Sequence, residues 1–299
     1  MSQQKVALVT GVSSGIGQAT AAQLLERGFR TFGTLRGTSG GSKLPPGLDL
    51  VHLDVRDDES VRSCVRAVLN QTGRIDALIN SAGYALFGAV EEITIEEAKR
   101  VFETNFFGVL RMCQAVLPIM REQNCGRIAN ISSVLGFLPA PYMGVYAASK
   151  HAIEGYSQSL DHEVRRFGIR VSVIEPGFTR TSLGYNQQLA SRPVPVYSRE
   201  RYRVMAAIAG NLANGDHPAT VASVVLEALT SRSPRLRYQS GPKAKLLNVL
   251  RKFAPSSLVD RGLRKQFGLD GTSNVPSRGL DSAAAPRSSS WSSACRWFH

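Results

Sequence analysis

The chain has 299 residues and a formal net charge of +13. Hydrophobic residues make up 43% of it and charged residues 20%, which excludes a wholly disordered chain because the apolar surface is sufficient to offset the conformational entropy lost on folding. The length suits one large domain or two small ones, since single cores stop growing at roughly 250 to 300 residues.

The four cysteines carry information about the compartment. Cys64, Cys113, Cys125 and Cys295 lie far apart, without a Cys-x-x-Cys pair, so we expect neither a metal site nor a disulfide framework, and we expect a reducing, cytoplasmic environment. Residues 1–10 lead directly into a strand-like stretch, so no signal peptide is expected. No apolar run approaches the roughly 18 residues of a membrane span.

Apolar, β-branched stretches alternate along the chain with amphipathic ones, which is typical of βαβ units. Strands are predicted at 6–10, 30–35, 50–53, 77–80, 127–131, 170–174 and 236–239. Helices are predicted at 15–27, 57–72, 94–122, 146–167 and 218–231. Such apolar strands are buried on both faces. The expected fold is α/β, a doubly wound, Rossmann-like parallel sheet forming a single domain over residues 1–270 with a C-terminal helical extension.

The pattern loosens after residue 177. Residues 178–215 begin with little periodicity and contain Pro193 and Pro195, so we predict a loop beside the substrate. Residues 271–299 are rich in Ser, Ala, Gly and Pro and are expected to form a disordered tail.

Most of the positive charge lies near the C-terminus. Residues 232–270 hold ten Lys or Arg and two Asp, and basic helices are predicted over 243–268, where Leu246, Val249, Leu250 and Phe253 fall at helical spacing. Such a run is either a solvated face or a contact with nucleic acid or a membrane surface. Interleaved aromatic residues for base stacking are missing, so we expect no nucleic-acid partner and at most a weak membrane contact.

A glycine-rich stretch follows the first strand and opens the first helix, reading Thr10-Gly-Val-Ser-Ser-Gly-Ile-Gly17. At that position, backbone N–H groups and the helix dipole can meet a phosphate. Gly11 permits the turn, Gly15 allows close approach of a pyrophosphate, and Gly17 lets helix and strand pack. A flexible loop without a ligand is the alternative.

The end of the second strand bears on cofactor choice. An NAD-preferring fold places an acid there for the ribose hydroxyls, whereas this chain has Arg36, whose guanidinium can bind a 2′-phosphate with help from Ser14. We therefore expect NADP(H), unless Arg36 is simply an exposed loop residue. Asp54 either accepts a hydrogen bond from the adenine amino group or caps the following helix.

Four further residues are candidates for catalysis. Tyr146 and Lys150 are four apart and share one helix face, and an ammonium there would favour the phenolate of a tyrosine whose ordinary pKa is about 10. Ser133 lies at a carboxyl end of the sheet, where ligands of open α/β folds bind. Asn105, within a predicted helix, is either a tolerated polar residue or part of a water relay.

Together these residues resemble the short-chain dehydrogenase/reductase family. Its glycine motif matches Thr10 to Gly17, its Asn-Asn-Ala-Gly motif matches 80–83 with Ser81 as a departure, and its Pro-Gly motif matches 176–177. Its catalytic tetrad matches Asn105, Ser133, Tyr146 and Lys150. The strings 33–36, 145–150 and 228–238 are similar to the 17-beta-hydroxysteroid and retinol dehydrogenase branch.

The resemblance implies hydride transfer between a nicotinamide and a carbonyl carbon. Tyr146 would give the proton to the carbonyl oxygen in reduction or take it from the alcohol in oxidation, and Ser133 would bind the same oxygen. Lys150 would lower the pKa of Tyr146 and bind the nicotinamide ribose, while Asn105 would anchor a water molecule. Cofactor contacts are implied at Gly11, Ser13, Ser14, Gly15, Ile16, Gly17, Arg36, Asp54, Val55, Asn80, Ala82, Gly83, Tyr146, Lys150, Pro176, Gly177 and Thr179.

The expected substrate is a small lipophilic ketone, aldehyde or alcohol, such as a steroid or retinoid, and the expected direction is reduction. The predicted pocket walls are apolar and contain Phe87, Phe137, Leu138, Tyr142, Met143 and Phe178. Members of this family are mostly dimers or tetramers that pair helices like those at 97–122 and 146–167, so a homodimer is expected. The rival hypotheses are a non-catalytic NADP(H)-sensing protein and a peripheral membrane protein.

Overall fold

The computed structural model describes residues 4–37, 44–181 and 188–270. The chain divides into two units, residues 1–269 and residues 270–299. The tail expected at 271–299 lies outside the described residues, as does Cys295, while Cys64, Cys113 and Cys125 are free thiols. No described helix is both long enough and apolar enough to cross a membrane.

A seven-stranded parallel sheet forms the centre of the first unit, as predicted, with strand order β3-β2-β1-β4-β6-β7-β9. The strands are β1 Val6–Val9, β2 Arg30–Leu35, β3 Asp49–His52, β4 Ala77–Asn80, β6 Gly126–Ile131, β7 Ile169–Pro176 and β9 Arg237–Ser240. The strand order reverses between β1 and β4. At such a switch point the carboxyl ends of parallel strands leave a crevice in which ligands bind.

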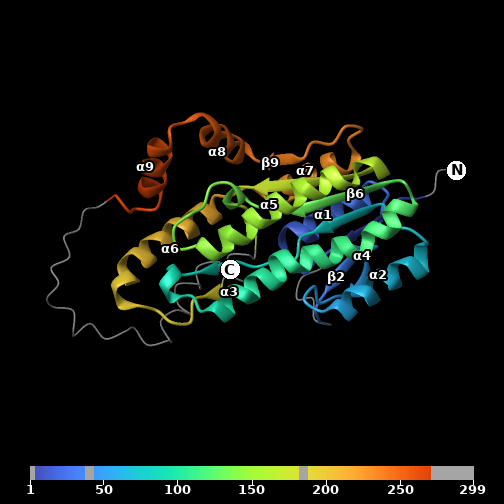
Figure 1. Ribbon diagram of the computed structural model, residues 1–299, viewed down its shortest axis with the longest axis horizontal. Helices are drawn as coiled ribbons and strands as arrows, with labels where there is room; N and C mark the ends of the chain where they lie inside the picture. Colours follow the sequence, from blue (N-terminus) through green and yellow to red (C-terminus); the bar gives the residue numbers. More distant parts are fainter. Residues whose placement is uncertain (1–3, 38–43, 182–187, 271–299) are drawn as a thin grey trace. The chain divides into compact units, whose positions relative to one another are not determined.

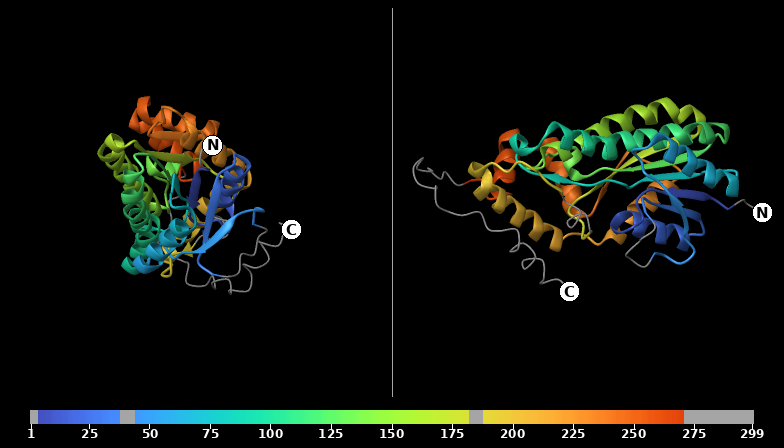
Figure 2. Two further views of the ribbon diagram at one scale, coloured as in Figure 1. Left: turned by 90° about the vertical axis from the view of Figure 1, so that its right-hand side faces the viewer. Right: turned by 90° about the horizontal axis from the view of Figure 1, so that it is seen from below.

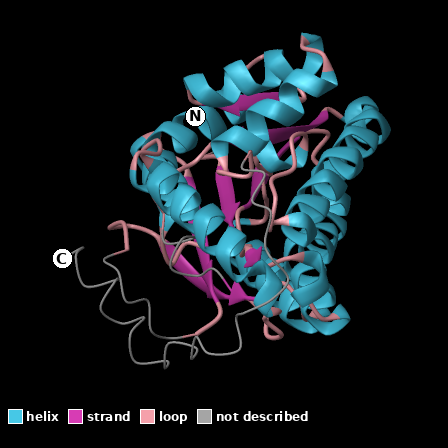
Figure 3. Cartoon of the chain, turned by 90° about the vertical axis from the view of Figure 1, so that its left-hand side faces the viewer, coloured by secondary structure: helices cyan, strands magenta, loops and turns pink. Residues whose placement is uncertain are grey.

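Helices cover both faces of the sheet (Figures 1 and 3). α1 Gly15–Glu26 and α7 Pro218–Thr230 pack over one face, and α2 Asp58–Thr72, α4 Gly108–Glu122 and α5 Gly144–Val164 cover the other. Figures 1 and 2 show α4 and α5 side by side. The alternation of side chains along β1 explains why each face of the sheet has a hydrophobic core. Successive side chains of a strand point to opposite faces, and all four β1 residues are buried.

The helix expected over 94–122 is present, but it is not α-helical throughout. α3 Ile95–Phe102 is followed by a π-helical segment, Glu103–Phe107, before α4 begins. The segment turns Thr104 and Asn105 inward, where both are buried. Such π-bulges are frequent at functional sites.

The prediction of a loop over 178–215 was also wrong for its second half. α6, Ser198–Ala213, occupies that part, and Gln188–Leu189 forms β8, which pairs with β5, Leu86–Phe87. Val204, Ile208 and Leu212 recur at helical spacing on α6 and face inward, a signal that the two prolines obscured.

Two buried carboxylates hold this segment against the preceding loop. Glu92 accepts hydrogen bonds from the backbone N–H groups of Ala89 and Val194, at 2.9 and 2.8 Å, and pairs with Arg201 of α6. Glu97 accepts a bond from the Ser191 N–H at 2.9 Å. The start of α6 is therefore fixed by charge-assisted bonds.

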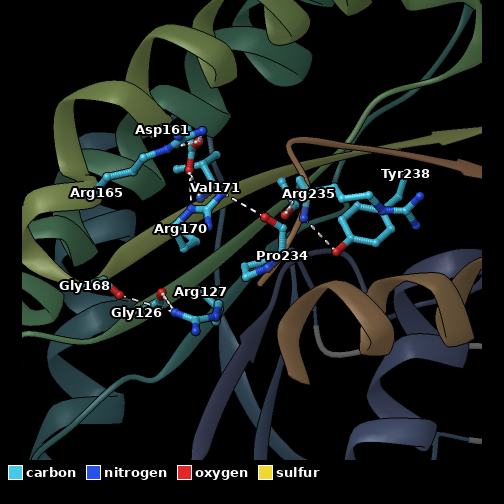
Figure 4. A network of polar contacts seen from close by, with 11 residues as sticks. Gly126, Arg127, Asp161, Arg165, Gly168, Arg170, Val171, Pro234, Arg235 and Tyr238 are labelled. Carbon is cyan, nitrogen blue, oxygen red and sulfur yellow. Dashed lines mark hydrogen bonds and ion pairs between the residues drawn. The ribbon is translucent and has the colours of Figure 1, made fainter. Parts of the chain in front are cut away.

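The C-terminal half of α5 is tied to β7 through Asp161 (Figure 4). Its fully buried carboxylate accepts bonds from the Val171 N–H at 2.9 Å, from Arg165 at 2.8 and 2.5 Å, and from Arg170 at 3.1 Å. Because Tyr146 and Lys150 lie on α5 and Pro176 ends β7, this network fixes two elements that border the candidate site.

Candidate active site

A cavity of about 730 Å³ follows the carboxyl edge of the sheet, within the size range of ligand sites. All but three of the predicted site residues line it: Gly11, Ser13, Ser14, Gly15, Ile16, Arg36, Asp54, Val55, Ala82, Gly83, Ser133, Tyr146, Lys150, Pro176, Gly177 and Thr179. The other three, Gly17, Asn80 and Asn105, are buried and do not line the cavity.

The glycine loop has the tight backbone that its sequence predicts. Gly11 has φ +72°, and a Cβ atom there would come within 3.0 Å of the Ala82 Cα. A Cβ atom on Gly17 would overlap the carbonyl oxygen of Gly11. The Thr10 hydroxyl accepts bonds from the N–H groups of Ser81 and Ala82, both at 3.0 Å. The loop and the start of α1 thus form an open backbone cradle suited to a pyrophosphate.

Asp54 does not cap the following helix, which was one of its two expected roles. Its carboxylate lies in a fork formed by the Arg56 side chain, with N–O distances of 2.5 to 3.2 Å, and Arg56 holds the pKa of Asp54 at about 2. The cap of α2 is Asp57, which accepts a bond from the Glu59 N–H at 2.8 Å. A contact from Asp54 to adenine would have to share this carboxylate with Arg56.

Sequence reasoning missed two of the three arginines at this end of the cavity, Arg56 and Arg100. Arg36 lines the cavity, as predicted, and is exposed. Three arginine charges act on the phenol of Tyr84, which also lines the cavity: Arg36, Arg56 and Arg100. Their convergence makes this end attractive to an anion.

Tyr146, Ser133 and Lys150 meet in the middle of the cavity. Burial raises the pKa of Tyr146 to about 12, and a hydrogen bond with Ser133 opposes part of the rise. The Lys150 ammonium lies 5.6 Å from the centre of the Tyr146 ring and donates to the Ile131 carbonyl oxygen at 2.8 Å. The expected lowering of the Tyr146 pKa is therefore not found, because burial outweighs other influences. Burial also lowers the pKa of Lys150 to about 8.

The Asn105 side chain forms hydrogen bonds with the backbone of Tyr84. It accepts a bond from the Tyr84 N–H at 3.0 Å and donates to the Tyr84 carbonyl oxygen at 2.9 Å. A Cβ atom on Gly83 would lie 3.0 Å from the Asn105 oxygen and 4.0 Å from the Lys150 nitrogen. The Asn80 side-chain amide on β4 donates a hydrogen bond to the side-chain oxygen of Asn130 on β6 at 2.8 Å. This bond supports β4.

Apolar side chains wall the other end of the cavity. Leu138, Met143 and Phe178 line it as expected. Phe87 does not, because it is buried and stacks on Tyr142 with ring centres 6.0 Å apart, and Phe137 and Tyr142 are also not among the lining residues. The missed lining residues come from α6, from α8 Pro242–Phe253, and from α9 Ser256–Gln266 and its C-terminal end: Ile208, Leu212, Leu247, Leu263, Gln266 and Phe267.

Two buried carboxyl groups lie behind Lys150, between α5, β7 and β9. Arg237 is 3.0 Å from Glu154 and 3.6 Å from Glu175, and Gln239 donates a hydrogen bond to Glu175. Burial and the neighbouring charge of Glu154 raise the pKa of Glu175 to about 7. One guanidinium therefore faces two carboxyl groups, and the pair holds a proton more tightly than an exposed carboxyl does.

This pair should make the stability of the protein depend on pH. A carboxyl whose pKa is higher in the folded than in the unfolded state stabilises the fold below its unfolded pKa, and the contribution is lost as pH rises through the folded pKa. The free energy of unfolding should fall by up to about 3 kcal/mol from about pH 5 to about pH 7, and Glu175→Gln should remove most of that fall.

The measurement is urea unfolding across that pH range. Glu227→Gln, at a side chain that is 57% exposed, is the matched control and should keep the wild-type slope. Equal slopes for wild type and Glu175→Gln would contradict the prediction.

Comparison with known proteins agrees with the fold and the motifs. The family model described as short chain dehydrogenase matches residues 5–191, and the chain belongs to that family of oxidoreductases, as its resemblance predicted. A 3-ketodihydrosphingosine reductase of Bacteroides thetaiotaomicron is 36% identical over 265 residues, which is 88% of this chain and 97% of that protein. Retinol dehydrogenase 8 of Bos taurus is 33% identical over 273 residues, 84% of this chain and 86% of that protein.

Solved structures match over most of the chain. A short-chain dehydrogenase from Streptomyces avermitilis is 32% identical with a TM-score of 0.76, covering 91% of this chain and all of that one. A Burkholderia phymatum member in complex with NAD has a TM-score of 0.72 at 26% identity, over 84% and 93% of the two chains. A Burkholderia cenocepacia member in complex with NADP has a TM-score of 0.70 at 26% identity, over 87% and 97%. A nicotinamide dinucleotide is the cofactor of this enzyme class.

Proposed function

We propose that the protein is an NADP(H)-dependent oxidoreductase that reduces a ketone or aldehyde on a lipophilic molecule. The observation that carries the proposal is a single cavity with three parts. A glycine cradle and arginines form one end, Tyr146 with Ser133 and Lys150 lies in the middle, and apolar walls form the other end. This order matches a dinucleotide, a reacting carbonyl and an apolar substrate body.

When bound, the reduced cofactor supplies the hydride, and the chain supplies binding, orientation and the proton. Tyr146 donates its phenolic proton to the substrate oxygen, and the Ser133 hydroxyl holds the same oxygen. Lys150 binds the nicotinamide ribose. Asn105 holds the backbone at Tyr84, which keeps Gly83 close to Lys150.

The raised pKa of Tyr146 is consistent with its role as the acid in reduction. With a pKa of about 12, the phenol keeps its proton at neutral pH and is ready to act as an acid. Oxidation needs the phenolate as a base, which burial disfavours. The Lys150 ammonium, with a pKa of about 8, stabilises the phenolate that forms when the proton leaves.

The walls support a lipophilic substrate. Leu138, Met143, Ile208, Leu212 and Phe267 surround the space beyond Tyr146, and side chains of this kind gain by removing apolar surface from water. The similar reductase named for 3-ketodihydrosphingosine and the dehydrogenase named for retinol favour a long or bulky apolar carbonyl compound.

Arg36 supports NADPH over NADH, and substitutions there test the preference. A charge-assisted contact to a 2′-phosphate is worth about 1.5 to 3 kcal/mol, roughly 10- to 150-fold in preference. Arg36→Ala should lower the affinity for NADPH and leave that for NADH almost unchanged. Leu35→Asp should reverse the preference, because a carboxylate repels the phosphate and accepts bonds from free ribose hydroxyls.

The readout is kcat/KM with both cofactors on one accepted carbonyl compound. Arg56→Ala is the control that distinguishes the effects of the two arginines. Because Arg56 is paired with Asp54, its loss should change the cofactor preference less than Arg36→Ala does. An unchanged preference in Arg36→Ala would contradict the NADP(H) assignment: no loss with either cofactor would mean that Arg36 is only an exposed loop residue, and an equal loss with both would mean that it does not read the 2′-phosphate.

We also infer a cytoplasmic homodimer that pairs α4 and α5. These helices lie side by side (Figure 1), and sedimentation equilibrium gives the mass directly. A monomeric mass at micromolar concentration would overturn this part of the proposal.

A further inference from the structure

α8 carries an apolar stripe that points away from the rest of the described chain. Leu246, Val249, Leu250 and Phe253 are 59%, 52%, 43% and 81% exposed, and their spacing places them on one face of the helix. Ala244, on the opposite side, is fully buried. The side that normally faces water is therefore apolar, and Figure 1 shows α8 and α9 at the margin of the described chain.

Basic side chains flank this stripe. Lys243, Lys245, Arg251 and Lys252 are all exposed on α8, which carries no acidic residue. α9 adds Arg261, Arg264 and Lys265 beside a single acid, Asp260, and Leu258 there is 56% exposed. Within residues 188–270, none of these seven basic side chains makes an ion pair. The surface is thus both apolar and strongly positive.

An anionic lipid bilayer matches both properties. Apolar side chains of an interfacial helix enter the boundary between headgroups and acyl chains, while lysine and arginine stems extend to the anionic headgroups. A second copy of the chain fits less well, because a two-fold contact sets a patch against itself and would bring the basic residues of both copies together. The phosphates of a nucleic acid would satisfy the charges but leave the stripe in water.

The same helices also wall the cavity. Leu247 of α8 and Leu263 of α9 line its apolar end, together with Phe267 just after α9. α8 and α9 therefore face the cavity on one side and solvent on the other.

We propose that α8 and α9 form a docking surface for anionic lipid bilayers, which brings the apolar end of the cavity to the bilayer that holds the lipophilic substrate. The docking surface is inferred from the exposed side chains alone, whereas the statement about the substrate rests on the proposed function.

Sedimentation of the full-length protein with vesicles tests the docking surface. Wild type should bind vesicles of phosphatidylcholine mixed with phosphatidylglycerol, and binding should weaken with pure phosphatidylcholine or with added salt. The double variant Leu246→Gln/Leu250→Gln should bind at least about tenfold more weakly, since two apolar side chains no longer leave water favourably. The matched control is Val196→Gln/Tyr202→Gln, at side chains that are 72% and 70% exposed near α6, and it should bind like wild type.

Three results would overturn the docking surface. They are equal binding by the two double variants, equal binding to neutral and anionic vesicles, and a wild-type dimer that dissociates in Leu246→Gln/Leu250→Gln. A water-soluble carbonyl substrate without vesicles separates this proposal from the proposed function, because both double variants should reduce it at the wild-type rate. Vesicle binding without any carbonyl reduction would keep the docking surface and overturn the statement about the substrate.

Discussion

Replacing Tyr146 with Phe should lower kcat by about 100- to 10,000-fold, the range that general acid catalysis contributes. The phenyl ring keeps the packing of this buried side chain, which lies in a cluster with Ala85, Phe87 and Met143, but it has no proton to give. Cofactor affinity, measured by quenching of protein fluorescence, should stay nearly unchanged.

Lys150→Ala is the informative comparison, because it should weaken cofactor binding as well as turnover. Retention of more than about a tenth of the wild-type rate in Tyr146→Phe would contradict the assigned acid. A non-catalytic cofactor sensor would show no turnover in any of the three proteins.

Asp161→Ala should lower the free energy of unfolding by about 3 to 5 kcal/mol, the cost of breaking a buried ion pair. Burial disfavours the Asp161 carboxylate, but the Val171 N–H, Arg165 and Arg170 outweigh it and hold its pKa below the usual value. Val171, Arg165 and Arg170, drawn in Figure 4, would lose the acceptor that they share.

The pH dependence of this loss has a definite sign. A lowered pKa gives stability above the unfolded pKa, and that stability is lost as pH falls through the folded pKa. The difference between wild type and Asp161→Ala should therefore shrink in acid. Arg165→Ala, at a side chain that is 47% exposed, should cost less than about 1 kcal/mol. A loss below about 1 kcal/mol for Asp161→Ala in urea unfolding at neutral pH would contradict the prediction.

The seven strands and the glycine cradle could be predicted because their signals are local. Each strand is a short apolar run between turns, and the motif from Thr10 to Gly17 directly follows the first one. The residues lining the cavity from Gly11 to Thr179 follow from the family resemblance, since every motif precedes or follows a predicted element.

What sequence could not predict depends on side chains that meet only in the folded chain. Arg56 pairs with Asp54, a contact that the sequence pattern does not predict. Glu154 and Glu175 are brought together by α5 and β7, and no local sequence pattern predicts that pair. Burial raises the pKa of Tyr146, whereas its spacing from Lys150 suggested the opposite direction.

The inward turn of Asn105 needs the π-helical segment, because a regular helix over the same residues would rotate the side chain to another side. α6 was hidden by Pro193 and Pro195, although both prolines precede the helix. The hidden helix supplies Ile208 and Leu212 to the apolar end of the cavity, which was therefore only half predicted.

The central claim is that Tyr146 transfers a proton during NADPH-dependent reduction of a lipophilic carbonyl compound. The most direct measurement is the absorbance of reduced cofactor with wild type and Tyr146→Phe, over a panel of ketones and aldehydes of increasing apolar size. We predict that wild type oxidises NADPH with at least one large apolar carbonyl compound and much more slowly with small polar ones, and that Tyr146→Phe lowers the rate at least about 100-fold. Equal rates for both proteins, or turnover only with small charged carbonyl compounds, would contradict the account.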